Sequence, residues 1–244
     1  MSADDYREWL ISRRKMLALL GATGITMFTG CSSRGSGTKE VDGRMLSCIV
    51  TPQQTEGPYF VEERLDRADI RSDPSDGSMK EGLPLALEIR VSSVNKTECK
   101  PLEGAIVDIW HCDAEGVYSD VVDSNFNTVG KKFLRGSQVT DTNGSARFIT
   151  IYPGWYPGRT PHIHFKIRTD PKHTRTYEFT SQLYFDDSIS DLVYAQPPYA
   201  KRGPRTRKNK GDAIFWMGGS QLILTLIKSD TGYVGSFNVG LEIA

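Results

Sequence analysis

Large apolar side chains recur at every second position along much of the chain beyond residue 80, which is the spacing of a strand that buries one face. The clearest stretch is 83–94, where one side of the predicted strand carries Leu85, Leu87, Ile89 and Val91. Similar stretches predict strands at 105–112, 133–140, 145–151, 163–167, 176–185, 219–227 and 232–243. Because no segment after residue 40 has the period of an amphipathic helix, we expect an all-β fold, a single-domain β-sandwich of mostly antiparallel strands with long loops.

Turn-forming residues separate these strands. Asp141-Thr142-Asn143-Gly144 lies between two of them, and Asn-Gly in so short a connection predicts a β-hairpin that joins 133–140 to 145–151. Polar segments at 66–80 and 194–211 are predicted to be surface loops, the second because it is rich in proline and basic residues.

The composition narrows the partners to consider. The chain has 244 residues, of which 38% are apolar, enough to bury one sizeable core once a removable N-terminus is set aside. Thirty basic residues balance thirty acidic ones. A formal charge of zero gives no electrostatic case for a nucleic-acid or acidic-polymer partner, so we expect a small-molecule substrate.

The first 31 residues have the pattern of an export signal. Ser12-Arg13-Arg14-Lys15-Met16-Leu17 resembles a twin-arginine export motif, and a modestly apolar run follows. The run ends at Thr29-Gly30-Cys31, which resembles a lipoprotein cleavage site and would leave Cys31 as a lipid anchor; an ordinary signal peptidase cutting nearby is the alternative. We therefore expect an exported protein, periplasmic, on the cell surface or extracellular, with residues 32–43 as a linker and 44–244 as the folded domain.

Three cysteines remain in this predicted mature chain: Cys48, Cys99 and Cys112. An oxidising compartment allows one disulfide among them, but their spacing does not say which two pair. No Cys-x-x-Cys spacing occurs in the sequence, which excludes a zinc ribbon.

Candidate chemistry is concentrated in the stretch 154–165. Its two prolines and two glycines rule out a helix and favour a strand that is entered from a tight turn. On a strand over 163–167, His162 and His164 leave the same face and lie close enough to bind one metal ion. Two histidines without a nearby cysteine argue against a structural zinc site and allow iron, copper or a three-ligand catalytic zinc.

Tyrosine is the ligand type that would distinguish these metals, because a phenolate is a hard, strongly donating oxygen that suits Fe(III). Tyr156 stands six residues before His162, across a Pro-Gly turn that can fold it back over the same ion, and Tyr118 follows the end of another predicted strand. The remaining histidines are not expected to bind metal, since His111 is predicted to be hydrogen-bonded inside the protein and His173 stands in a polar loop.

Five motifs follow one another along the chain: Asp108-Ile109-Trp110-His111-Cys112-Asp113-Ala114-Glu115-Gly116-Val117-Tyr118, Phe133-Leu134-Arg135-Gly136, Asp141-Thr142-Asn143-Gly144, Tyr156-Pro157 with Arg159 and Pro161-His162-Ile163-His164, and Ser181-Gln182-Leu183-Tyr184-Phe185. Their order resembles that of the intradiol ring-cleavage dioxygenases, over residues 48–190. The resemblance implies a β-sandwich enzyme with a non-haem Fe(III) that cleaves a catechol-type diol with O2 to a cis,cis-muconate-type diacid.

Carried over by position, the resemblance implies four metal ligands: Tyr118, Tyr156, His162 and His164. Tyr156 would be the axial ligand that leaves when the substrate binds and then accepts one of its protons. Arg159 would be the active-site arginine that favours the developing negative charge. Gln182 would be the polar partner that faces the substrate and oxygen.

Two other functions are compatible with the same residues. One is an exported, non-catalytic metal-binding β-sandwich protein. The other is a zinc hydrolase that uses His162, His164 and a carboxylate such as Asp113. The segment between Tyr156 and His162 is also shorter than in the protocatechuate enzymes, so the resemblance does not transfer the substituents of the catechol.

Overall fold

The computed structural model describes residues 38–41, 44–47, 49–95, 98–169 and 177–243. The chain divides into two units, residues 1–35 and 36–244, and the architecture below is that of the second. The predicted export signal with Cys31, and also Cys48 and His173, lie outside the described residues. Within the described part of the chain, no helix has the length and apolar character needed to cross a membrane.

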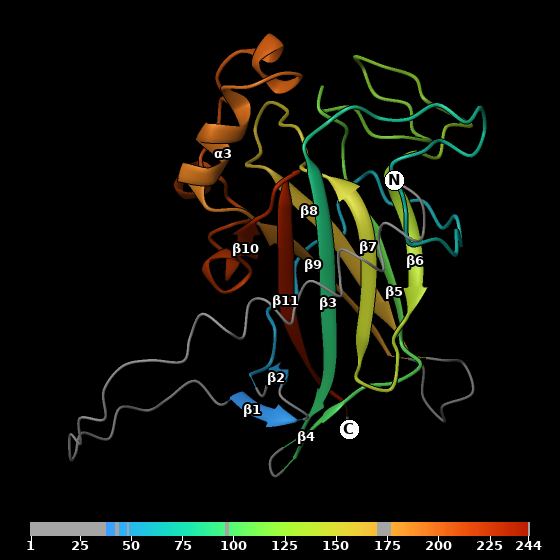
Figure 1. Cartoon of the computed structure of the whole chain (residues 1–244), viewed down its shortest axis with the longest axis vertical. Coiled ribbons are helices and arrows are strands. Elements are labelled where there is room, and N and C mark those ends of the chain that lie inside the picture. Colours follow the sequence, from blue (N-terminus) through green and yellow to red (C-terminus); the bar gives the residue numbers. More distant parts are fainter. Residues whose placement is uncertain (1–37, 42–43, 48, 96–97, 170–176, 244) are drawn as a thin grey trace, which may run out of the picture. The chain divides into compact units, whose positions relative to one another are not determined.

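Two sheets form a β-sandwich, as predicted (Figure 1). The first sheet contains β10 (Thr225–Lys228), β11 (Tyr233–Glu242) and β3 (Pro84–Val94), with both β4 (Cys99–Pro101) and β7 (Ser145–Ile151) on the far edge of β3. The second has the order β6 (Arg135–Val139), β5 (Ile106–Trp110), β8 (His162–Arg168) and β9 (Glu178–Tyr184). All of these pairs are antiparallel except β3 with β11, which run parallel.

The core lies between the two sheets and follows the predicted alternation. On β3 the inward side chains are Leu85, Leu87, Ile89 and Val91, all of them buried. On β8 they are Ile163, Phe165 and Ile167, all of them fully buried. Because neighbouring residues of a strand point to opposite faces, His162 and His164 stand on the outer face of the four-stranded sheet.

The predicted hairpin between 133–140 and 145–151 is wrong. Strand β6 pairs with β5, whereas β7 pairs with β3, so the turn at 141–144 crosses from one sheet to the other. The local turn chemistry is as predicted, because Asp141 accepts hydrogen bonds from the backbone N–H groups of Asn143 and Ser145. A Cβ on Gly144 would lie 2.2 Å from the carbonyl oxygen of Val91, so the turn packs against β3.

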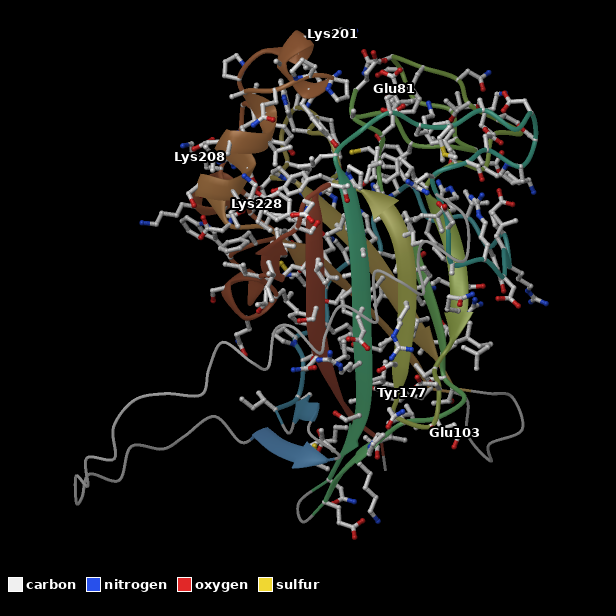
Figure 2. The ribbon with its side chains drawn as sticks, in the orientation of Figure 1. Glu81, Glu103, Tyr177, Lys201, Lys208 and Lys228 are labelled. Atoms are coloured by element: carbon white, nitrogen blue, oxygen red, sulfur yellow. The ribbon has the colours of Figure 1, made fainter. Side chains whose placement is uncertain are left out.

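The C-terminal third contains short helices that the sequence pattern did not predict. Helix α3 (Asp187–Tyr194) begins after Asp186, whose carboxylate accepts a hydrogen bond from the N–H of Ser188. The predicted surface loop at 194–211 contains the 3-10 helices η2 (Tyr199–Arg202) and η3 (Asn209–Gly211). Most of its basic side chains are exposed, as Figure 2 shows for Lys201 and Lys208, but the side chain of Arg205 is buried against Asp187. Tyr194, Tyr199 and Asn209 are buried as well.

Two further boundaries differ from the prediction. The strand expected over 219–227 is shorter, because 3-10 helix η4 (Gly219–Gln221) precedes β10. At the other end of the unit, residues 38–41 of the predicted linker form strand β1 (Thr38–Val41), which pairs antiparallel with β2 (Arg44–Ser47).

Candidate metal centre

The register of the four-stranded sheet lines up side chains from all of its strands. Successive cross-strand partners on β6, β5, β8 and β9 are Arg135, Trp110, His164 and Gln182. Directly opposed residues of antiparallel strands share a face, so this row runs across the outer face. The indole of Trp110 stacks on the imidazole of His164, with ring centroids 4.9 Å apart and planes 7° from parallel. The sheet therefore fixes the plane of the His164 ring.

The four predicted ligands meet at one point beside this row. The Nε2 atom of His162 lies 3.0 Å from Nε2 of His164, 3.4 Å from the phenol oxygen of Tyr118 and 3.2 Å from that of Tyr156. Both imidazoles and Tyr118 are buried, whereas Tyr156 is only partly buried. Two ring nitrogens and two phenol oxygens, three of them from residues 156–164 and the fourth from Tyr118, thus share one small volume.

Two packed turns bring the tyrosines to this point. The turn after β5 is closed by Asp113, whose Oδ1 accepts hydrogen bonds from the N–H groups of Glu115 and Val117, and it leads to Tyr118. The turn that leads to Tyr156 packs against this first turn through backbone atoms. The N–H of Gly154 donates to the carbonyl of Asp113 at 3.1 Å. The separation of the two phenols is therefore set by backbone contact.

Tyr118 is also held by a third aromatic ring and by a buried arginine. Its ring stacks on Tyr59 with centroids 4.5 Å apart, and Tyr59 donates a hydrogen bond to Asp123. Arg135, from the outer row, is buried and donates to the backbone carbonyls of Ser119 and Tyr59. These contacts hold the ring and the backbone of Tyr118 and so fix the position of its phenol oxygen.

The two imidazoles are neutral. Burial lowers the pKa of His162 to about 3, and burial together with the nearby His162 and Arg159 lowers that of His164 well below its usual value. Nδ1 of His162 lies 2.7 Å from the carbonyl oxygen of Thr160, an acceptor, so Nδ1 carries the proton and Nε2 presents a lone pair to the cluster. Neutral imidazole with a fixed tautomer is the form that binds metals.

The donor set fits a highly charged cation. Burial raises the pKa of both Tyr118 and Tyr156, so the phenols stay protonated unless a positive charge is bound beside them. Nδ1 of His164 is buried and has no hydrogen-bond partner among the described residues. Two neutral imidazoles and two hard phenol oxygens are suited to Fe(III).

Arg159 and Gln182 lie at the same centre, as predicted. A terminal nitrogen of Arg159 lies 3.4 Å from Nε2 of His162, and the other donates to the side-chain oxygen of Gln182. The Nε of Arg159 donates to a carboxylate oxygen of Asp212 at 2.8 Å. Gln182 in turn donates to the backbone carbonyl of Thr55, and the hydroxyl of Tyr184 lies 3.1 Å from its side-chain oxygen.

Asp212 is the residue of this centre that sequence reasoning missed. It follows a basic stretch that was predicted to be a surface loop, and no local pattern connects it to Arg159. Asp212 and Arg159 are 53 positions apart in the sequence, and only the folded structure brings them together.

The zinc-hydrolase alternative is not supported. Asp113, its proposed third ligand, is bound instead by the ammonium of Lys80 at 2.9 Å and by the turn that precedes Tyr118. Nowhere in the described ranges do three or more His, Cys, Asp or Glu side chains gather as a metal site. The oxygen ligands that join the two histidines in the described structure are the phenols of Tyr118 and Tyr156, a residue type outside that set.

Two other expectations concern residues near the centre. His111 is buried and structural, as predicted, with its ring nitrogens 2.8 Å from the carbonyl oxygen of Cys112 and 2.7 Å from the hydroxyl of Thr150. Of the cysteines in the described ranges, Cys99 is disulfide-bonded and Cys112 is a free, buried thiol. Cys112 is therefore the cysteine that was expected to be left over.

Fold and site together define an all-β sandwich protein with a largely buried cluster of two histidines and two tyrosines on the outer face of one sheet. Residues 55–202 match the family model described as "Dioxygenase". That match covers more than half of the chain. The protein therefore belongs to the intradiol ring-cleavage dioxygenase family.

Curated relatives and solved structures agree with this assignment. The chain is 30% identical over 154 residues to the protocatechuate 3,4-dioxygenase beta chain of Burkholderia cepacia, covering 59% of this chain and 63% of that protein. It is 27% identical over 195 residues to catechol 1,2-dioxygenase 1 of Acinetobacter lwoffii, covering 67% of this chain and 56% of that protein. The chain thus spans less than two thirds of the length of these relatives.

Among solved structures, an intradiol ring-cleavage dioxygenase from Tetranychus urticae is 32% identical to this chain, with a TM-score of 0.69. The similarity covers 80% of this chain and 95% of that one. The dioxygenase domain of a carbohydrate-binding fusion protein from Streptomyces sp. SirexAA-E is 30% identical, with a TM-score of 0.57.

Proposed function

We propose that this protein is a non-haem Fe(III)-dependent intradiol dioxygenase that cleaves a catechol-type aromatic diol with O2 to a cis,cis-muconate-type diacid. The observation that carries the proposal is the meeting of Tyr118, Tyr156 and His164 within 3.4 Å of Nε2 of His162. Family membership supports the same class of reaction, and the names of two curated relatives include catechol and protocatechuate.

In this proposal the four side chains would hold the metal, and the rest of the site would hold the substrate. When bound, Fe(III) would supply a Lewis acid that lowers the pKa of the catechol hydroxyls and draws electron density from the diolate. Tyr118 is buried and stacked on Tyr59, whereas Tyr156 is partly exposed on its turn. Tyr156 is therefore the phenol that can swing away for a substrate oxygen and accept a substrate proton.

Arg159 and Gln182 would act on the substrate and its products. The guanidinium lies beside His162, where a diol that displaces Tyr156 would place its oxygens, so its charge favours the anionic forms of substrate and product. Gln182 is fully buried and its amide is fixed between Arg159 and the carbonyl of Thr55. It would hold the substrate's oxygens in a single orientation.

The test of this function is the colour and the oxygen consumption of the purified protein. Tyrosinate bound to Fe(III) gives a visible charge-transfer band, so the iron-loaded protein should be red to burgundy. Oxygen uptake should follow the addition of catechol, protocatechuate or hydroxyquinol, and the ring-opened diacid should appear in equal amount. A colourless protein that binds zinc at full occupancy and not iron would contradict the proposal. A coloured protein that consumes no oxygen with any catechol would favour the non-catalytic metal binder.

We also propose that the protein is exported and anchored by a lipid on Cys31, on the strength of the N-terminal motifs alone. The natural protein should sediment with membranes, and Cys31→Ala should release it into the soluble exported fraction. Replacing both Arg13 and Arg14 with lysine should hold it inside the cell. Ser32→Ala serves as the control and should remain with the membranes. Equal distribution of Cys31→Ala and Ser32→Ala would contradict the lipid anchor.

A further inference from the structure

We infer that Asp212 is a positioning residue of this site, which holds the guanidinium of Arg159 in the one orientation that faces both His162 and Gln182. The inference rests on the proposed function for its catalytic consequence. The orientation of Arg159 by Asp212 is a property of the protein itself and does not depend on a bound metal or substrate.

The carboxylate of Asp212 is saturated by four N–H donors. Its Oδ2 accepts hydrogen bonds from Nε of Arg159 and from the backbone N–H of Thr160, both at 2.8 Å. Its Oδ1 accepts from the backbone N–H groups of Ile214 at 2.8 Å and Phe215 at 3.1 Å. The side chain is fully buried. Because three of the four donors are backbone groups, the carboxylate is fixed by the fold before Arg159 binds to it.

Fixing Nε fixes the remainder of the guanidinium, which is planar. With Nε on Asp212, one terminal nitrogen is directed to Gln182 and the other lies 3.4 Å from Nε2 of His162. The side chain of Arg159 is 16% exposed, so it has an open direction into which it could turn. Without Asp212, its Nε–H would lose its partner and the cation would be drawn toward water. Asp212 therefore keeps a positive charge beside the metal ligands and the substrate.

The carboxylate comes from a part of the chain that lies beyond the stretch matched by the family model, which ends at residue 202. A second residue of the same segment, Asn209, anchors it independently. The side-chain oxygen of Asn209 accepts from the hydroxyl of Thr160, and its amide donates to the carbonyl of Phe185. Asn209 is buried and binds the same loop as Asp212, but among the described residues its side-chain hydrogen bonds go to Thr160 and Phe185 and not to Arg159. It therefore offers a matched control.

The structural part can be tested on the metal-free protein by the hydrogen exchange of the Arg159 Nε–H, observed by 15N NMR and assigned by its loss in Arg159→Lys. We expect slow exchange in the natural protein. Asp212→Ala should accelerate it by about tenfold or more, because the proton loses a charged acceptor, whereas Asn209→Ala should leave it slow. Fast exchange in the natural protein overturns the inference, even where Asp212→Ala does not fold. Equal exchange in the two alanine variants also overturns it.

The catalytic part is tested on the iron-loaded protein with a double-mutant cycle. Asp212→Ala should lower kcat by about tenfold to a hundredfold, since a misplaced guanidinium no longer opposes the developing charge. The same change in an Arg159→Ala background should lower kcat little further, because the group that it positions is absent. An equal loss in both backgrounds would assign Asp212 to the folding of the segment instead. If the natural protein consumes no oxygen at all, the proposed function fails, while the exchange result still decides the positioning.

Discussion

Tyr118→Phe should remove most of the visible absorption of the iron-loaded protein and lower kcat for the catechol by about a thousandfold or more. In the proposed centre, the phenol oxygen of Tyr118 would be one of two anionic ligands, and it belongs to the tyrosine that is buried. A phenyl ring offers no donor in its place. The remaining ligands, Tyr156, His162 and His164, would carry one negative charge instead of two, which weakens binding of a trivalent ion.

The same substitution should hardly change the stability of the metal-free protein. Among the described residues, this phenol meets the phenol of Tyr156 and Nε2 of His162, and its 3.4 Å distance to His162 is long for a hydrogen bond. We therefore expect the free energy of unfolding to change by less than about 1 kcal/mol. Iron should raise the midpoint of thermal unfolding of the natural protein and raise that of Tyr118→Phe much less.

The matched control for this prediction is Tyr59→Phe. It keeps the ring that stacks on Tyr118 and removes only the hydroxyl that donates to Asp123. The control should retain the visible band. If absorption and iron binding fall equally in both variants, or if Tyr118→Phe keeps the full band, the assignment of Tyr118 as a ligand is wrong.

Part of this centre was predictable because strands have a period of two. Once 163–167 is read as a strand, the burial of Ile163 and Phe165 forces His162 and His164 to the other face, and the structure confirms this. The roles of Tyr118, Arg159 and Gln182 were implied by the resemblance. Their meeting with the histidines follows from register and turn packing, which no local pattern specifies.

The failures of sequence reasoning share a cause. Asn143-Gly144 specifies a tight turn, and the turn forms, but the choice of partner strand depends on which sheet each neighbouring strand joins. Helix α3 is eight residues long, too short for a period of 3.6 to stand out. Asp212 is polar within a polar stretch, and only its burial against Arg159 separates it from a surface carboxylate. The turn and the polar character of Asp212 could be read from neighbouring residues. The choice of partner strand and the pairing with Arg159 depend on residues far apart in the sequence and could not.

Gly154→Ala should disturb both the fold and the proposed metal centre. A Cβ at this position would lie 2.3 Å from the carbonyl oxygen of Asp113 and 2.6 Å from that of Ala114, and backbone atoms cannot give way as a flexible side chain can. The free energy of unfolding of the metal-free protein should fall by about 3 kcal/mol, at the upper end of what overpacking costs. Denaturant titration measures this loss directly.

Gly154→Ala should also affect the site, because the two turns that pack together at Gly154 carry the two phenols. One leads to Tyr118 and the other to Tyr156, so separating them by the space that a methyl group requires moves the two phenols apart. A displacement on the order of 1 Å can cost about a hundredfold in rate, and we expect kcat to fall by that factor with a weakened charge-transfer band.

Gly104→Ala is the control: its φ of 77° strains a side chain, but no other atom of the described structure lies within 4 Å of the new Cβ. It should lose about 1 kcal/mol of stability and keep the band and the rate. A Gly154→Ala protein with the stability, colour and rate of the natural one would show that contact between the turns does not set the spacing of the phenols.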